Sequence, residues 1–321
     1  MKEHGLNTKR VFAVFLIVVM LGASLNAPAV TDKGGSSDSK HLHEKKIGRA
    51  PAVLWTDPVD IASRDLFYGC GGTEHQPRGK LKFIKEKRTG NNPKFDVRDA
   101  DGVRWGVKMG VEARPETAAS RLVWAVGYFA NEDYYLPELP VRIPVLSRGQ
   151  ELIQDNKIHG VRLKRHSKKS HKIGYWTWNN NPFAGTRELN GLKVMMELIN
   201  NTDLKPEHLV IYDVDGDEQR YMINDLGGSF GRAGAHFYNR TKGVLTDFKS
   251  YPLITGVGAD FVDFWYFKHV PRADAKWIGG ILDRLSDEQI SDAFRAAGFS
   301  PEEVDGFTRK IREKINELTN L

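Results

Sequence analysis

One stretch decides the fold: Asn200-Asn201-Thr202-Asp203-Leu204-Lys205-Pro206-Glu207-His208-Leu209-Val210-Ile211. Before it, over 187–200, apolar residues recur at helical spacing, which predicts an amphipathic helix. Pro206 cannot continue that helix, because it lacks a backbone N–H and its ring collides with the preceding turn. From Leu209 to Tyr212 the residues are apolar, β-branched or aromatic, which predicts a strand. The sequence therefore predicts a helix, a short loop and a strand in direct succession.

A hairpin follows this loop and carries a second acid to its far end. Asp215-Gly216 predicts a tight turn, and residues 220–223 predict the returning strand. That strand leads to Asp225 and a glycine-rich segment, 226–231. Asp203 and Asp225 thus lie at the ends of paired strands, one before the hairpin and one after it. The residues alone leave two interpretations open, a catalytic pair or two solvated turn carboxylates.

Upstream, three short strands are predicted to lead into a helix. The strands are expected over 80–87, 95–98 and 104–108, separated by turns rich in Gly, Asn, Asp and Pro. Lys108 ends the third strand, and a helix opens at Pro115, where a missing N–H does no harm. Glu116, inside that helix, is the preferred partner of Lys108, and Glu112 is the second choice. The alternative is a surface lysine and an acid that merely favours the helix N-terminus.

Two of these segments match known motifs. Asp203-Leu204-Lys205-Pro206-Glu207 and Asp225-Leu226-Gly227 resemble the D-L-K-P-E-N loop and the D-F-G segment of the protein-kinase-like superfamily. The order of the parts is similar to that superfamily from about residue 65 to the end. The resemblance is of the atypical kind, nearer to HipA-like, spore-coat and secretory-pathway kinases. Residues 108–129 and 182–231 also resemble an uncharacterised exported bacterial family of kinase-like proteins. The implied fold is α+β and two-lobed, with a small antiparallel β lobe and a mainly helical larger lobe.

The resemblance also implies a chemistry. A kinase-like phosphotransferase would bind ATP and Mg²⁺ and pass the γ-phosphoryl group to a hydroxyl of a protein or small molecule. Asp203 would then be the catalytic base, with Lys205 balancing charge on the transferred group. Lys108, held by Glu116, would bind the α- and β-phosphates, and Asp225 would be a metal ligand. The resemblance implies that His208 is a second metal ligand or a group on the acceptor side.

The sequence departs from the family pattern in four places, one of them a slightly longer gap between His208 and Asp225 than is usual. His208 stands where a metal-binding Asn is usual, and Asn201-Thr202 stands where His-Arg is usual. The turn 88–93, the candidate phosphate cover, lacks the family's repeated glycines. These departures keep two other functions open. One is an exported pseudokinase, a binding module without turnover. The other is transfer of a nucleotidyl group on the same fold.

Several other segments carry expectations. The basic run 155–172 is expected to be a solvated loop, with binding of acidic or phosphate groups as the alternative. The aromatic run 175–178 either lines the cleft or packs within a lobe. Further strands are expected at 134–136 and 141–145, and residues 235–272 are expected to be irregular. Three scaffold helices are expected at the C-terminal end, over 277–285, 287–297 and 302–318.

Composition and charge set the remaining expectations. The chain has 321 residues, 40% of them hydrophobic and 27% charged, which is typical of a globular protein. Its formal charge of +6 favours anionic partners such as nucleotides, without implying specific nucleic-acid binding. Cys70 is the single cysteine, so no internal disulfide is possible.

The first residues look like a targeting segment. Residues 1–29 combine a basic start, a short apolar run and small residues, which predicts a signal peptide. The protein is therefore expected to be exported, periplasmic or secreted, with an N-terminal membrane anchor as the minor alternative. No span is expected in the mature chain. We expect a flexible linker over 30–50, a β-rich lobe with one helix over 51–178, and a mainly helical lobe carrying the hairpin over 179–321.

Overall fold

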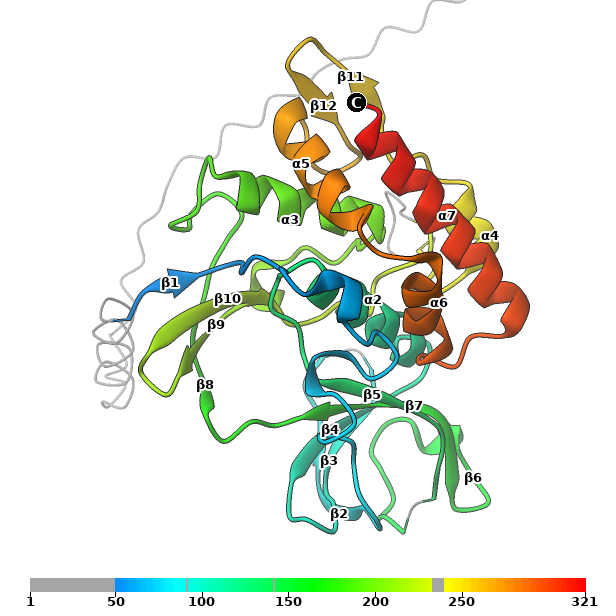
Figure 1. Cartoon of the computed structure of the whole chain (residues 1–321). Coiled ribbons are helices and arrows are strands. Elements are labelled where there is room, and N and C mark those ends of the chain that lie inside the picture. Colours follow the sequence, from blue (N-terminus) through cyan, green and yellow to red (C-terminus); the bar gives the residue numbers. More distant parts are fainter. Residues whose placement is uncertain (1–49, 91, 141, 233–239) are drawn as a thin grey trace, which may run out of the picture.

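The computed structural model describes residues 50–90, 92–140, 142–232 and 240–321 (Figure 1). Within these residues the chain forms three β-sheets and six α-helices, so the expected α+β class is confirmed. The predicted signal peptide lies outside the described residues, as does the predicted linker up to residue 49. Among the described residues, no helix combines the length and the apolar character needed to cross a membrane.

The largest sheet is antiparallel and contains the three strands predicted before residue 110. Its strand order is β2-β3-β4-β7-β5, with β6 paired to β7. The bounds are β2 (Lys82–Lys87), β3 (Lys94–Arg98), β4 (Arg104–Met109), β5 (Asp133–Pro140), β6 (Ile153–Gln154) and β7 (Lys157–Arg165). One face of the sheet buries an apolar cluster that includes Phe95, Trp105 and Leu163. The helix α2 (Ala113–Ala125) follows β4 and packs against β5 and β7.

The predicted hairpin lies in a second sheet. Its strand order is β1-β10-β9-β8, where β1 runs parallel to β10 and the other pairs are antiparallel. The bounds are β1 (Ala52–Val53), β8 (Ser170–Tyr175), β9 (Leu209–Val214) and β10 (Glu218–Ile223). The sheet joins strands from both sides of residue 178. The division of the chain at that residue stays a prediction.

The remaining helices, most of which lie at the opposite end of the molecule from β2 and β3 (Figure 1), contribute side chains to the larger apolar core. They are α3 (Arg187–Leu198), α4 (Leu245–Lys249), α5 (Arg272–Leu282), α6 (Asp287–Arg295) and α7 (Pro301–Thr319). Four phenylalanine rings from these helices and the loop before α4 pack together, namely Phe230, Phe248, Phe294 and Phe307. Capping boxes at Ser286 and Ser300 begin α6 and α7, which places both helix starts where the sequence predicts them.

Three expectations about secondary structure were wrong. Residues 142–145 form no strand, because β5 ends at Pro140. The basic run 155–172, expected as a loop, contains all of β7 and the start of β8. Within 240–272, expected to be irregular, lie α4 and a small sheet of β11 (Gly256–Val257), β12 (Phe261–Asp263) and β13 (Val270–Pro271). These last elements have five residues or fewer, too short for a periodic signal.

Candidate active site

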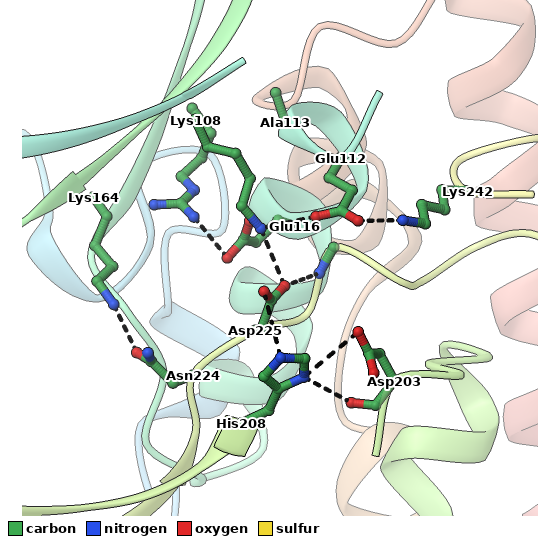
Figure 2. A network of polar contacts seen from close by, with 12 residues as sticks. Lys108, Glu112, Ala113, Glu116, Lys164, Asp203, His208, Asn224, Asp225 and Lys242 are labelled. Atoms are coloured by element: carbon green, nitrogen blue, oxygen red, sulfur yellow. Dashed lines mark hydrogen bonds and ion pairs between the residues drawn. The ribbon is translucent and has the colours of Figure 1, made fainter. Parts of the chain in front are cut away.

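The side chain of Lys108 lies at the centre of a buried cluster of acids (Figure 2). Its Nζ lies 2.6 Å from Glu116, 2.9 Å from Glu112 and 3.1 Å from Asp225. The ammonium donates hydrogen bonds to Glu112 and Asp225 and forms an ion pair with Glu116, so one of its three donor hydrogens is left without a hydrogen bond to these acids. The structure thus brings Lys108, Glu116 and Asp225 together as the sequence predicts. Glu112, the second choice, contacts the same amine at a slightly longer distance.

Local sequence explains how two acids reach one lysine. Glu112 is the N-cap residue of α2 and Glu116 lies in its first turn, so the two project from one face of the helix. The positive end of the helix dipole favours acids at this position. Asp225 arrives from the end of β10, where the Gly227 backbone N–H donates to its Oδ1 at 3.2 Å. A side chain on Gly227 would meet Glu112 at 2.8 Å, so glycine lets this loop pass beneath α2.

Mutual attraction keeps these groups charged despite their burial. Burial alone would lower the pKa of Lys108, but Glu116 and Asp225 hold that pKa above its ordinary value. Burial would likewise raise the pKa of Asp225, yet Lys108 holds it well below the usual range. Lys108 and the ion-paired Lys242 lower the pKa of Glu112 to about 2 against the effect of burial. Lys108, Glu112 and Asp225 are therefore charged at neutral pH.

A second set of charged residues supports the first, and the sequence patterns did not predict it. Arg162 on β7 lies 2.8 Å from Glu116 and 3.5 Å from Asp133. Lys164, two residues further on, donates to Asn224 Oδ1 at 2.6 Å, next to Asp225 (Figure 2). Burial raises the pKa of Asp133 to about 6 and lowers that of Lys164 to about 8. A signal was present, because basic residues at 162 and 164 alternate with apolar residues at 161 and 163.

The loop that contains Asp203 lies beside the cluster. Asp203 Oδ1 forms an ion pair with Lys205 at 3.0 Å, and this contact raises the pKa of the exposed lysine. His208 lies between the two aspartates (Figure 2). Its Nδ1 is 3.2 Å from the Asp203 carbonyl oxygen, and its Nε2 is 4.0 Å from Asp225 Oδ2. The buried Asn201 fixes the loop by accepting the Asp203 N–H at 3.2 Å.

The aromatic run 175–178, which begins at the last residue of β8, packs against the loop that contains Asp203. Trp178 donates from Nε1 to the Leu204 carbonyl at 3.2 Å and meets Phe267 with ring centroids 4.8 Å apart. Trp176 is buried and donates to the Met222 carbonyl at 3.4 Å. Neither indole lines the cavity described next. Of the two interpretations left open by the sequence, the structure favours packing, with Trp178 supporting the loop of Asp203.

A cavity of about 190 Å³ opens beside Lys108 and Asp225. Its charged lining is mostly basic. The residues that line it are Lys87, Thr89, Lys94, Gly106, Val107, Lys108, Glu116, Arg162, Lys164, His166, Asn224 and Asp225. Thr89 comes from the turn 88–93, the predicted phosphate cover, so that turn does border the cavity. A basic, partly enclosed space of this kind suits a small anion.

The acids of the cluster also form a possible metal-binding group. Carboxylate oxygens of Glu112, Glu116 and Asp225 lie within 4.8 Å of one another. The ammonium of Lys108 contacts all three acids, so it already supplies the positive charge that they need. Asp225 has a second oxygen, Oδ2, on the side of His208. Asp225 is therefore the acid of this group best placed to bind a cation with its other oxygen.

Comparisons with known proteins add little. No family model matches the chain, and no curated protein sequence matches it. Among solved structures, the chain is similar to the crystal structure of the proinflammatory kinase CtkA from Helicobacter pylori. The two share 11% sequence identity with a TM-score of 0.47, over 76% of this chain and 98% of the other. We assign nothing to this chain from that likeness.

Proposed function

We propose that this chain is a kinase-like phosphotransferase, which uses ATP and Mg²⁺ to transfer a γ-phosphoryl group to a hydroxyl. One observation carries the proposal: Lys108, Glu116 and Asp225 meet in one buried cluster beside a basic cavity, although Asp225 lies 117 residues from Lys108. The proposal requires that Lys108 does not point into water, and its side chain is in fact buried. The two-lobed layout, the atypical kinase family and export through residues 1–29 belong to the same proposal.

Phosphoryl transfer requires positioning and neutralisation of charge more than covalent chemistry. Lys108 contacts the phosphates of the nucleotide, and Glu116 holds the amine in place. Arg162 in turn holds Glu116 at 2.8 Å, so the lysine is oriented before any ligand arrives. Asp203 orients the acceptor hydroxyl and takes its proton, while Lys205, 3.0 Å away, balances charge on the transferred group.

The donor set fits one magnesium ion. Mg²⁺ is bound in such sites by one or two carboxylates together with substrate phosphates and water. Asp225 supplies the carboxylate, and bound magnesium would neutralise charge that develops on the phosphates. His208 is a poorer ligand for Mg²⁺, because imidazole suits softer metals. Its position between Asp203 and Asp225 suits a group that fixes the loop, through the 3.2 Å contact with the Asp203 carbonyl.

A binding module without turnover is the second candidate. It is favoured by His208 in place of an amide ligand, and by the amine of Lys108, whose charge three carboxylates already compensate. Transfer of a nucleotidyl group is the third. The products separate these functions, because phosphoryl transfer releases ADP and nucleotidyl transfer releases pyrophosphate. A module without turnover releases neither product.

Binding is tested first, by thermal unfolding with ATP and Mg²⁺. Wild type is compared with Asp225→Asn and with Asp217→Asn, a control at an exposed carboxylate in the hairpin turn. We expect ligand-dependent stabilisation in wild type and Asp217→Asn and its loss in Asp225→Asn. Release of ADP is then measured in wild type and Asp203→Asn, where we expect a decrease of about 100-fold or more. Absence of stabilisation in every variant would contradict a nucleotide-dependent function.

A further inference from the structure

Four cations form one row across the large sheet. Strand register pairs Lys87 with Lys94, Lys94 with Lys108, and Lys108 with Arg162. Residues paired directly across neighbouring strands project from the same face of a sheet. All four of these residues line the basic cavity, which confirms that the row faces the candidate active site. The row therefore runs across β2, β3, β4 and β7, perpendicular to the strands.

Three members of the row have acidic partners. Lys87 lies 2.8 Å from the buried carboxylate of Asp96, while Lys108 and Arg162 both contact Glu116. Lys94 differs from them, because no carboxylate of the described residues lies within 4.0 Å of its ammonium. Its nearest charged neighbours across the strands, Lys87 and Lys108, carry the same sign. Lys94 is therefore the one member of the row whose charge is left for a ligand.

Lys94 is half-buried, so a positive charge without an acidic partner is unfavourable at this position. Burial and the charge of Lys108 lower the pKa of the Lys94 amine, although Asp225 and Glu116 act in the opposite direction, and an anion in the cavity would offset the lowering by favouring the charged amine. The adjacent turn 88–93 lacks the closely spaced glycines through which backbone N–H groups can approach a phosphate. A lysine side chain at the start of β3 supplies a donor in the same place.

We propose that Lys94 is a phosphate-binding residue, and that a polyphosphate group lies across β3 and β4 with Lys94 and Lys108 both in contact with it. This inference rests on the proposed function for the identity of the ligand, a nucleotide triphosphate. It adds a residue that the motifs do not indicate. Neighbouring strands are about 4.8 Å apart, so two flexible lysine side chains from β3 and β4 can reach adjacent phosphates of one chain.

The test measures binding of ATP, adenosine and inorganic tripolyphosphate by calorimetry. The variants are Lys94→Gln, Lys94→Arg and Lys85→Gln, the last a control at an exposed lysine of β2 outside the cavity. We expect Lys94→Gln to weaken ATP and tripolyphosphate binding by about 10- to 100-fold, as the loss of one charged hydrogen bond does. Adenosine binding is expected to stay unchanged. Lys94→Arg is expected to remain within a few-fold of wild type, as is Lys85→Gln.

The three ligands and the variants together separate a failure of this inference from a failure of the proposed function. If Lys94→Gln binds ATP and tripolyphosphate as wild type does, Lys94 has no such role, although a kinase-like function survives. If wild type binds tripolyphosphate through Lys94 but neither ATP nor adenosine, the phosphate site is correct and the nucleotide is wrong. If wild type binds none of the three ligands, both ideas fail. The unfolding temperature of ligand-free Lys94→Gln checks that the variant is folded, and we expect it to equal or exceed that of wild type.

Discussion

The guanidinium of Arg162 lies 2.8 Å from Glu116 on α2 and 3.5 Å from Asp133 on β5, so one buried cation joins two acids from different elements. Fixed charges of this kind are sensitive to the loss of one partner, because the remaining charge stays buried and uncompensated. Replacing Arg162 by Met is expected to lower the free energy of unfolding by about 3–5 kcal/mol. Urea titration measures this loss.

Two further variants complete that test. Arg162→Lys keeps the positive charge but lacks the forked guanidinium, so we expect it to lower the free energy of unfolding by less than Arg162→Met does. Arg98→Met, at an exposed position of β3, serves as the control and is expected to change the free energy of unfolding by about 0.5 kcal/mol or less. Equal losses at positions 98 and 162 would show that the buried pair has no special role.

The two acids that contact Lys108 are predicted to be unequal. Glu116 binds both Lys108 and Arg162, whereas Glu112 binds Lys108 and the partly exposed Lys242. We expect Glu116→Gln to lower the free energy of unfolding by about 3 kcal/mol, because both of its cationic partners are buried and would be left with an uncompensated charge. Glu112→Gln is expected to cost about half as much, because Lys242 is partly exposed and water screens that ion pair. Parallel chemical denaturation of the two variants compares them. A larger loss of unfolding free energy in Glu112→Gln than in Glu116→Gln would show that Glu112 contributes more to stability.

Lys164 predicts a dependence of stability on pH. Burial lowers its folded pKa from 10.5 to about 8, so between these values the unfolded chain binds the proton and the folded chain does not. Stability from this group therefore rises as pH increases from 8 to 10.5, and its full penalty is present below pH 8. The difference in free energy of unfolding between wild type and Lys164→Met is expected to change by about 3 kcal/mol over this window.

Denaturation at several pH values measures that change. Lys157→Met, at an exposed lysine on the same strand, is the matched control, and its difference from wild type is expected to stay constant with pH. A pH-independent difference for Lys164→Met as well would mean that Lys164 titrates normally in the folded protein.

Trp178 is predicted to act as a positioning residue for the loop of Asp203. Its indole donates to the Leu204 carbonyl at 3.2 Å, and Trp178→Phe removes this bond while keeping an aromatic ring. A neutral hydrogen bond contributes about 1 kcal/mol, so ADP release is expected to fall about fivefold with the KM for ATP unchanged. A rise in KM with unchanged kcat would instead place Trp178 in nucleotide binding.

Local sequence patterns were sufficient to predict the site residues that lie next to clear turns, helix ends and strands. The predicted helix ends at Leu198, before Pro206, because Asn200 adopts a left-handed backbone, and Pro206 instead begins a short 3-10 helix. The helix, the loop and the Asp215-Gly216 turn still follow one another as the sequence predicts, so Asp203 and Asp225 could be placed without knowledge of the rest of the fold. Lys108 was also identified, because a strand and a helix with a proline in its first turn enclose it. The sequence favours Glu116 over Glu112, because it predicts a helix that opens at Pro115. The helix α2 begins at Ala113 with Glu112 as its N-cap, so both acids lie on one face and both contact Lys108.

Arg162 and Lys164 were missed for a physical reason. Charge runs are usually solvated, and the alternation of apolar and basic residues over 161–164 is also what a strand with one side in water would show, so the pattern does not reveal that the charged side is buried. Their partners, Asp133 and Asn224, are distant in sequence. The cationic row needed the register of four strands, and a shift of one residue in any strand would turn its lysine to the opposite face. No local pattern specifies that register.

The short strand β1 has a practical consequence for handling the protein. Ala52 and Val53 pair with Gln219 and Arg220 in parallel, so the chain enters the sheet beside the hairpin turn, at the end of β10 opposite to Asp225. An affinity tag placed ahead of residue 50 would join the molecule at that remote end. Immobilised samples should therefore keep their basic cavity open to nucleotides flowing over a sensor surface.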